Sequence, residues 1–95
     1  MKKLMNSLYI LTSDAYLTLD GENVVVKKNG AEMGRFPLHS LEQIVTFSYM
    51  GASPALMGKC AEQNKSLSFF SQSGRFLARV GGGVQGNVLL RRQQY

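Results

Sequence analysis

Arg75 and Arg79 are the two residues of this sequence whose type and spacing best suit a chemical task, the binding of phosphate groups. Both lie in the segment RFLARV at 75–80, whose aromatic and apolar residues are typical of a β-strand. Alternate side chains of a strand share a face, so the two guanidinium groups should project beside Leu77, roughly 13 Å apart, and reach separate phosphates. The opposite face, which should pack, consists of Phe76, Ala78 and Val80. The alternative is that both arginines belong to a solvated outer face.

Two further arginines, Arg91 and Arg92, could extend this basic strip. They lie in a segment that should begin a helix at Val88, with Asn87 as its cap. Adjacent helical positions diverge by about 100°, so the two side chains would point in different directions. The DNA-backbone candidates are therefore Arg75, Arg79, Arg91 and Arg92.

The other titratable residues do not combine into a catalytic or metal site. His39 is the only histidine and Cys60 the only cysteine, whereas a zinc site needs three or four ligands. Most of the acids fall at or near predicted turns, where solvated caps are expected. These acids are Asp14, Asp20, Glu22 and Glu32. Cys60 should be a small core residue and not a reactive thiol. We therefore expect no catalytic residue, metal or cofactor in this chain.

Residues 81–86 (GGGVQG) satisfy the G-x-G-x-x-G pattern of dinucleotide-binding proteins. The context does not fit this function, because the preceding strand should pair as a hairpin and not open a βαβ unit. A flexible glycine-rich linker over 81–87 is the favoured interpretation.

The basic excess lies in the second part of the chain. The 95 residues carry a net charge of +5; residues 59–95 hold six basic residues and one acid, whereas residues 1–58 hold five of each. Such an excess is typical of nucleic-acid binding, although many small basic domains bind nothing. With one cysteine and no apolar run near the roughly 20 residues that cross a bilayer, we expect a cytoplasmic protein without membrane association.

The elements that position these residues should form one small domain. The first half reads as antiparallel strands, with Asp20-Gly21 and Asn29-Gly30 as turns, since these dipeptides tolerate the positive φ angles of type I′ turns. Its strands are expected at residues 8–11, 15–19, 24–28 and 32–36.

The second half reads as strand, helix and strand. A strand at 43–47 should lead to a helix that begins at Pro54 with Ser53 as N-cap and stops at Asn64, followed by a parallel strand at 66–70. The apolar face of the helix should consist of Leu56, Met57, Cys60 and Ala61.

The predicted fold is mixed β with one or two helices (α+β), a small β-sandwich-like domain with antiparallel hairpins plus one βαβ unit. Residues 1–80 form this β domain, 81–87 the linker, and 88–95 the start of a helix. Since no stop signal follows that helix, a fragment is favoured over a domain that ends in a short C-terminal helix.

Four segments are characteristic in combination: GRFPL at 34–38, YMGASPALM at 49–57, GRFLARV at 74–80 and GNVLLRRQQY at 86–95. Together they resemble the amino-terminal domain of the CRISPR adaptation integrase, a DNA endonuclease, in the form found with type I systems. The resemblance covers essentially the whole chain.

The resemblance implies a homodimer whose amino-terminal domains pack together. Two such dimers would flank a dimer of a small partner subunit and hold foreign DNA for insertion into the CRISPR array. It also implies that magnesium or manganese binds to Glu, His and Asp in a following helical domain, so no metal ligand is assigned to any residue here.

Self-association should use sheet edges, because the short strands LYIL at 8–11 and VVV at 24–26 carry no evident protective device. We therefore interpret the chain as the non-catalytic dimerisation and DNA-positioning domain of a CRISPR adaptation integrase. The alternative is a free-standing protein-interaction module without a nucleic-acid role, whose basic residues only keep it soluble. An autonomous nuclease would need metal ligands that this sequence does not assemble.

Overall fold

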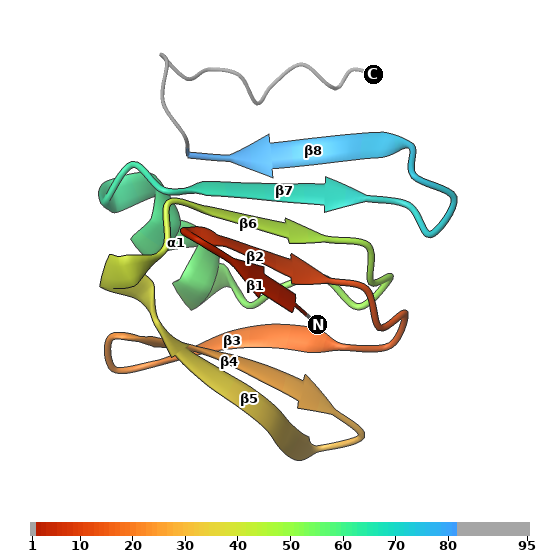
Figure 1. The fold of residues 1–95 in the computed structure, drawn as a ribbon, viewed down its shortest axis with the longest axis horizontal. Helices are drawn as coiled ribbons and strands as arrows, with labels where there is room; N and C mark the ends of the chain where they lie inside the picture. The colour runs from red at the N-terminus through yellow and green to blue at the C-terminus, as the bar shows by residue number, and fades with distance from the viewer. Residues whose placement is uncertain (1, 82–95) are drawn as a thin grey trace.

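The computed structural model describes residues 2–81, which form two β-sheets and one α-helix (Figure 1). The strands are β1 (Lys2–Leu4), β2 (Ser7–Ile10), β3 (Tyr16–Asp20), β4 (Asn23–Lys28), β5 (Ala31–Pro37), β6 (Gln43–Thr46), β7 (Ser66–Phe70) and β8 (Phe76–Val80). The helices are α1 (Pro54–Glu62) and a short 3-10 helix, η1 (Leu38–Ser40). One sheet has the order β1-β2-β6-β7-β8 and the other β3-β4-β5. The predicted class, a small mixed-β domain with hairpins and one βαβ unit, is confirmed.

The three-stranded sheet is the predicted antiparallel meander. Asn29 and Gly30 both have positive φ angles, 53° and 80°, as a type I′ turn requires. The other turn differs from the prediction. Asp20 pairs with Asn23, so Gly21 (φ 64°) is the first central residue and the only one there with positive φ. That pattern is the one preferred by type II′ turns.

The βαβ unit forms as the sequence predicts, since β6 and β7 pair in parallel and α1 connects them. Ser53 is the N-cap of α1, and its Oγ accepts a hydrogen bond from the Leu56 N–H at 3.2 Å. Asn64, with φ 60°, provides the left-handed stop just beyond the helix.

The buried face of α1 is narrower than predicted. Leu56 and Cys60 are fully buried and Met57 is partly buried, but Ala61 is exposed. Ala61 lies about 100° around the helix from Cys60, which turns it away from the strands that α1 contacts.

β2 is the main departure from the predicted strand arrangement. It pairs in parallel with β6, with Leu8 opposite Ile44, and does not join the antiparallel meander of the first half. Its antiparallel partner is β1, a strand that the sequence patterns did not indicate. The two strands are joined through a turn in which Met5 has φ 57°.

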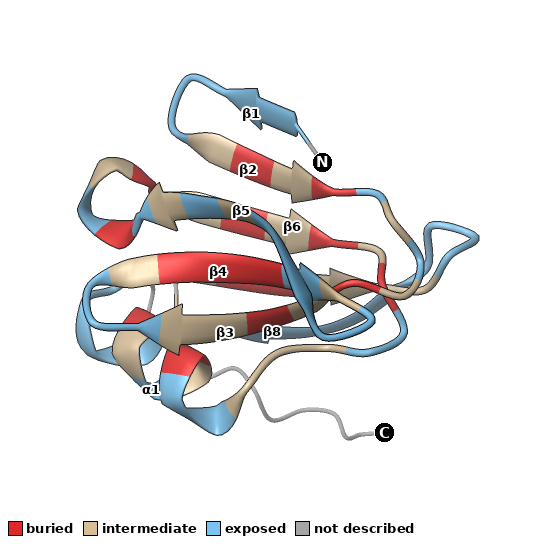
Figure 2. Ribbon diagram, turned by 90° about the horizontal axis from the view of Figure 1, so that it is seen from below, coloured by how far each residue is buried: buried red, intermediate tan, exposed pale blue. Residues whose placement is uncertain are grey.

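The hydrophobic core lies between the two sheets and α1 (Figure 2). Buried residues concentrate on β2, β4, β6 and the inner side of α1, whereas β1 is exposed along its length. The fully buried side chains include Leu8, Ile10, Leu17, Val24, Leu38, Leu41, Ile44, Leu56, Cys60 and Leu67. In the part of the chain that the structure describes, no helix is long and apolar enough to cross a membrane.

The strands predicted to expose sheet edges are both internal. β2 lies between β1 and β6, and β4 lies between β3 and β5, so neither LYIL nor VVV forms an edge. The outer side of β3 is covered, because the Leu17 N–H donates to the Gly51 carbonyl (3.1 Å) and the Ser53 N–H donates to the Leu17 carbonyl (2.8 Å). Of the remaining edges, β1 carries two lysines and β5 ends in Pro37. Lysine and proline both discourage edge pairing, so β8 is the least protected edge among the described strands.

Candidate nucleic-acid interface

Arg75 and Arg79 were predicted to project from one face of the same strand, but only Arg79 belongs to β8. Arg79 is within the strand, whereas Arg75 precedes it, in the turn that follows β7. The Arg75 N–H donates to Ser71 Oγ at 3.0 Å, and the register between β7 and β8 shifts at Phe69/Phe70. The regular alternation that placed both arginines on one face therefore does not extend to Arg75.

The face of β8 predicted to pack is largely exposed. Phe76 is 53% exposed and Ala78 is also exposed, and only Val80 packs against the core. β8 is the outermost strand, and α1 lies against its far end, where Gly81 follows Val80. Phe76 instead makes an edge-to-face contact with Phe70, with ring centroids 5.5 Å apart.

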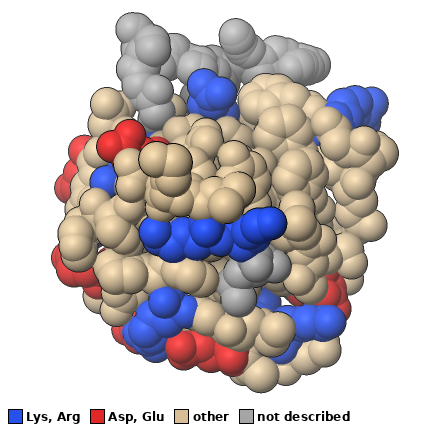
Figure 3. All heavy atoms as spheres, in the orientation of Figure 1, with Lys and Arg blue, Asp and Glu red and all other residues tan. Residues whose placement is uncertain are grey.

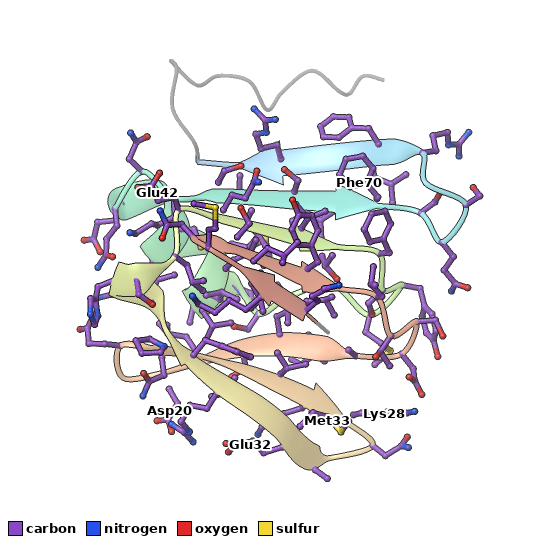
Figure 4. The ribbon with its side chains drawn as sticks, viewed as in Figure 1. Asp20, Lys28, Glu32, Met33, Glu42 and Phe70 are labelled. Carbon is purple, nitrogen blue, oxygen red and sulfur yellow. The ribbon has the colours of Figure 1, made fainter. Side chains whose placement is uncertain are left out.

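Arg79 lines an open depression at the end of the five-stranded sheet where β2, β6 and β7 begin. We call it the amino-end depression; its volume is about 740 Å³. It is lined by Met5, Asn6, Ser7, Glu42, Gln43, Gln63, Asn64, Lys65, Ser66 and Arg79. The parallel strands β2, β6 and β7 start at the same edge of the sheet, and antiparallel β8 ends there, so polar residues from four separate segments meet at this edge. Figure 4 shows Glu42 at this end of the sheet and Phe70 towards the opposite end.

The basic side chains around the amino-end depression are not neutralised by described acids. Lys65 and Arg79 make no ion pair within residues 2–81, and Glu42 is the only acid that lines the depression. Lys65 Nζ is 3.4 Å from the His39 carbonyl oxygen, a long hydrogen bond. At the rim, Lys3 Nζ donates to the Met5 carbonyl at 2.7 Å. This end of the molecule therefore has positive charge available for an anion.

The three-stranded sheet holds most of the ion pairs. Arg35 bridges two acids, with N–O distances of 2.8 Å to Asp20 and 3.1 Å to Glu32. The hydrogen bond from Arg35 lowers the pKa of the Glu32 carboxyl, and both acids raise the pKa of the Arg35 guanidinium.

The other two ion pairs are Lys28–Asp14 at 3.8 Å and Lys59–Glu22 at 3.5 Å. The acids and bases of this sheet thus largely cancel each other.

The basic side chains of the described residues fall into several groups on the surface. On the face shown in Figure 3, one band of basic side chains crosses the middle and other basic groups lie apart from it, with acidic side chains along the left and lower margins. Outside the described residues lie Arg91 and Arg92, the helix predicted at 88–95 and all but the first residue of the linker predicted at 81–87.

Within residues 2–81, no three His, Cys, Asp or Glu side chains lie together as metal ligands. His39 lies in η1 and is exposed. Cys60 is fully buried, and burial raises the pKa of its thiol to about 11, as predicted for a core residue.

Sequence reasoning missed Lys65 as a candidate binding residue. Its signal was available, because Lys65 lies between the helix stop at Asn64 and the start of a parallel strand. Such loops gather at one end of a sheet. The contribution of Asn6, which comes from the unpredicted turn after β1, had no comparable signal.

The comparison with known families agrees with the fold. The family model of the CRISPR associated protein Cas1 matches residues 8–95. The chain is 47% identical, over all 95 residues, to the CRISPR-associated endonuclease Cas1 2 of Rhodospirillum rubrum. The chain belongs to the Cas1 family. It spans 28% of the length of that relative.

Solved Cas1 structures share the fold at low sequence identity. The partial Cas6-RT-Cas1–Cas2 complex contains a chain that matches 83% of this one with a TM-score of 0.73 and 19% identity, over 24% of its own length. The crystal structure of the TtCas1–DNA complex matches 90% of this chain with a TM-score of 0.66 and 15% identity, over 33% of its own length. The two-sheet arrangement described here is therefore a Cas1 fold.

Proposed function

We propose that this chain is the amino-terminal, non-catalytic dimerisation and DNA-positioning domain of a CRISPR adaptation integrase. The observation that carries the proposal is the Cas1 family match over residues 8–95 on a domain with unpaired cations at one end of its larger sheet. Within the described residues these cations are not accompanied by a group of metal ligands. In this proposal the domain holds DNA, and the cleavage and joining of strands belong to another part of the protein.

The catalytic steps would belong to the remainder of the protein. This chain spans 28% of a relative that is named an endonuclease. We place the metal, magnesium or manganese, in a following helical domain with Glu, His and Asp ligands, and we assign no ligand to this chain. A bound metal there would activate a nucleophile and stabilise the leaving oxygen.

The DNA role is supported by the TtCas1–DNA complex, whose fold this chain shares. Arg75, Arg79, Arg91 and Arg92 are the proposed backbone contacts, and they would bind without base specificity, because phosphates carry no sequence information. About three such contacts would give a log-log salt slope near −3.

The proposed partners are a second copy of this chain and a small dimeric subunit, in the cytoplasm. A structural neighbour in a Cas1–Cas2 complex supports the small subunit. The exposed edge of β8, with Phe76 and Leu77 half exposed, supports self-association, because an edge with few charges readily pairs with another strand.

A binding and cleavage assay on the 95-residue chain tests the proposal. We expect a fluorescent duplex of about 30 base pairs to bind at low salt, to be released as salt rises, and to stay intact with magnesium or manganese. Metal-dependent cleavage that survives removal of contaminating nuclease would contradict the non-catalytic role. No binding at about 50 mM salt would instead favour the free-standing interaction module.

A further inference from the structure

We propose that the amino-end depression is a phosphodiester-binding site, in which Lys65 and Arg79 receive adjacent phosphates of one DNA strand. The inference rests on the proposed DNA role and specifies where on the domain the backbone lies. It also assigns a binding function to Lys65, and it places Arg75 outside the site.

The two cations of the depression, Lys65 and Arg79, lie on the same pair of strands. Lys65 directly precedes β7, and Arg79 lies on β8 opposite Ser68 of β7. The two residues therefore lie near the start of β7 and the end of β8, at the same end of this strand pair. Both line the depression, and neither forms an ion pair with a described acid. A phosphate that binds to either cation would therefore not have to displace a described acid.

Neutral side-chain amides, which can donate hydrogen bonds, line the depression together with the cations. The side-chain amides of Asn6, Gln63 and Asn64 line the depression and make no hydrogen bond to another described residue. By contrast, the Gln43 amide already donates to Ser7 Oγ at 3.0 Å. Neutral amides and cations together are the groups that usually contact the sugar-phosphate backbone.

Most main-chain N–H groups around the depression already have acceptors. The Gln43 N–H donates to the Asn6 carbonyl at 3.3 Å, and the Ser66 N–H donates to the Glu42 carbonyl at 3.0 Å. Recognition in the depression should therefore depend mainly on side chains, so side-chain substitutions should weaken it.

The negative charge of Glu42 should oppose the binding of a phosphate in the depression. Glu42 is the only acid lining the depression, and no described base pairs with it. A carboxylate near a bound phosphate repels it, so Glu42 would weaken DNA binding. Loss of this charge should strengthen binding, a gain that local misfolding would not produce.

The test is a salt titration of duplex binding with single variants of the 95-residue chain. Lys65→Gln and Arg79→Gln should each flatten the log-log salt slope by about 0.9. Glu42→Gln should tighten binding roughly two- to fivefold at about 50 mM salt. Lys65→Arg and Arg79→Lys, which keep the charge, should bind almost as the parent chain does.

Lys27→Gln is the matched control, because Lys27 is an exposed cation in β4, on the other sheet, and makes no ion pair with a described acid. It measures the effect of one charge away from the depression, and the effects of Lys65→Gln and Arg79→Gln must exceed it. Unfolding by urea verifies that each variant remains folded.

Two results would overturn the inference in different ways. If Arg75→Gln flattens the salt slope while Lys65→Gln, Arg79→Gln and Glu42→Gln match the control, DNA binds elsewhere and only the depression is rejected. If the parent chain binds no DNA at low salt, the proposed function and this inference fail together.

Discussion

Gly81 is a residue whose backbone conformation and surroundings both exclude a side chain. Its φ is 71°, and a Cβ there would collide with the carbonyl oxygen of Lys65 and lie 3.0 Å from that of Cys60. We expect Gly81→Ala to lower the free energy of unfolding by about 2 kcal/mol or more. Gly58, within α1, has open space around it, so Gly58→Ala should raise stability by roughly 0.5–1 kcal/mol. Urea unfolding measures both, and shifts of the same sign would contradict this account of Gly81.

The thiol of Cys60 should be unreactive in the folded chain. Burial raises its pKa from the ordinary 9.0 to about 11, so the folded state keeps a proton that the unfolded state loses in this range. Stability should therefore be fully present below pH 9.0 and fall as the pH rises towards about 11. We expect iodoacetamide at mildly alkaline pH to label Cys60 only after urea is added. Rapid labelling of the folded protein would show that α1 opens readily.

At the scale of elements, β8 is the strand on which association should depend. Leu77 is 51% exposed on this edge strand, and lysine on an edge opposes strand pairing. We expect the parent chain to sediment as a dimer at high micromolar concentration and Leu77→Lys to sediment as a monomer.

Met33→Lys provides the matched control for this prediction, because Met33 is also 51% exposed and lies on β5, the edge of the other sheet. It should leave the dimer intact. Dimers that persist in Leu77→Lys but dissociate in Met33→Lys would place the contact on β5 instead.

The elements predicted correctly from sequence are those specified by local signals. Asn29-Gly30 marks one turn of the meander, and Ser53-Pro54 marks the start of α1. Strand pairings between segments that are distant in the chain have no local sequence signal. The parallel pairing of β2 with β6 is an example, in which Leu8 becomes buried in the core. The three residues of β1 are too few to show an alternating pattern. For the site, Arg79 was predicted, but the register shift beside β8 removed Arg75 from the expected face.

At the scale of the whole molecule, the two sheets divide the charges between them. The three-stranded sheet pairs most of its acids and bases, whereas the amino-end depression of the five-stranded sheet keeps Lys65 and Arg79 unpaired among the described residues. Electrostatic attraction to a polyanion should therefore act mainly on one end of the larger sheet. The aromatic contacts of Phe70 with Phe47 and Phe76 lie towards the other end.

The most direct measurement of this account is a map of backbone amide chemical shifts in the 95-residue chain as duplex DNA is added at low salt. The account predicts that the largest changes occur around the amino-end depression, at Ser7, Gln43, Lys65, Ser66 and Arg79. The amides of β4 and β5 should change little. The largest changes on the three-stranded sheet, or none anywhere on the chain, would contradict the claim that this end of the domain holds DNA.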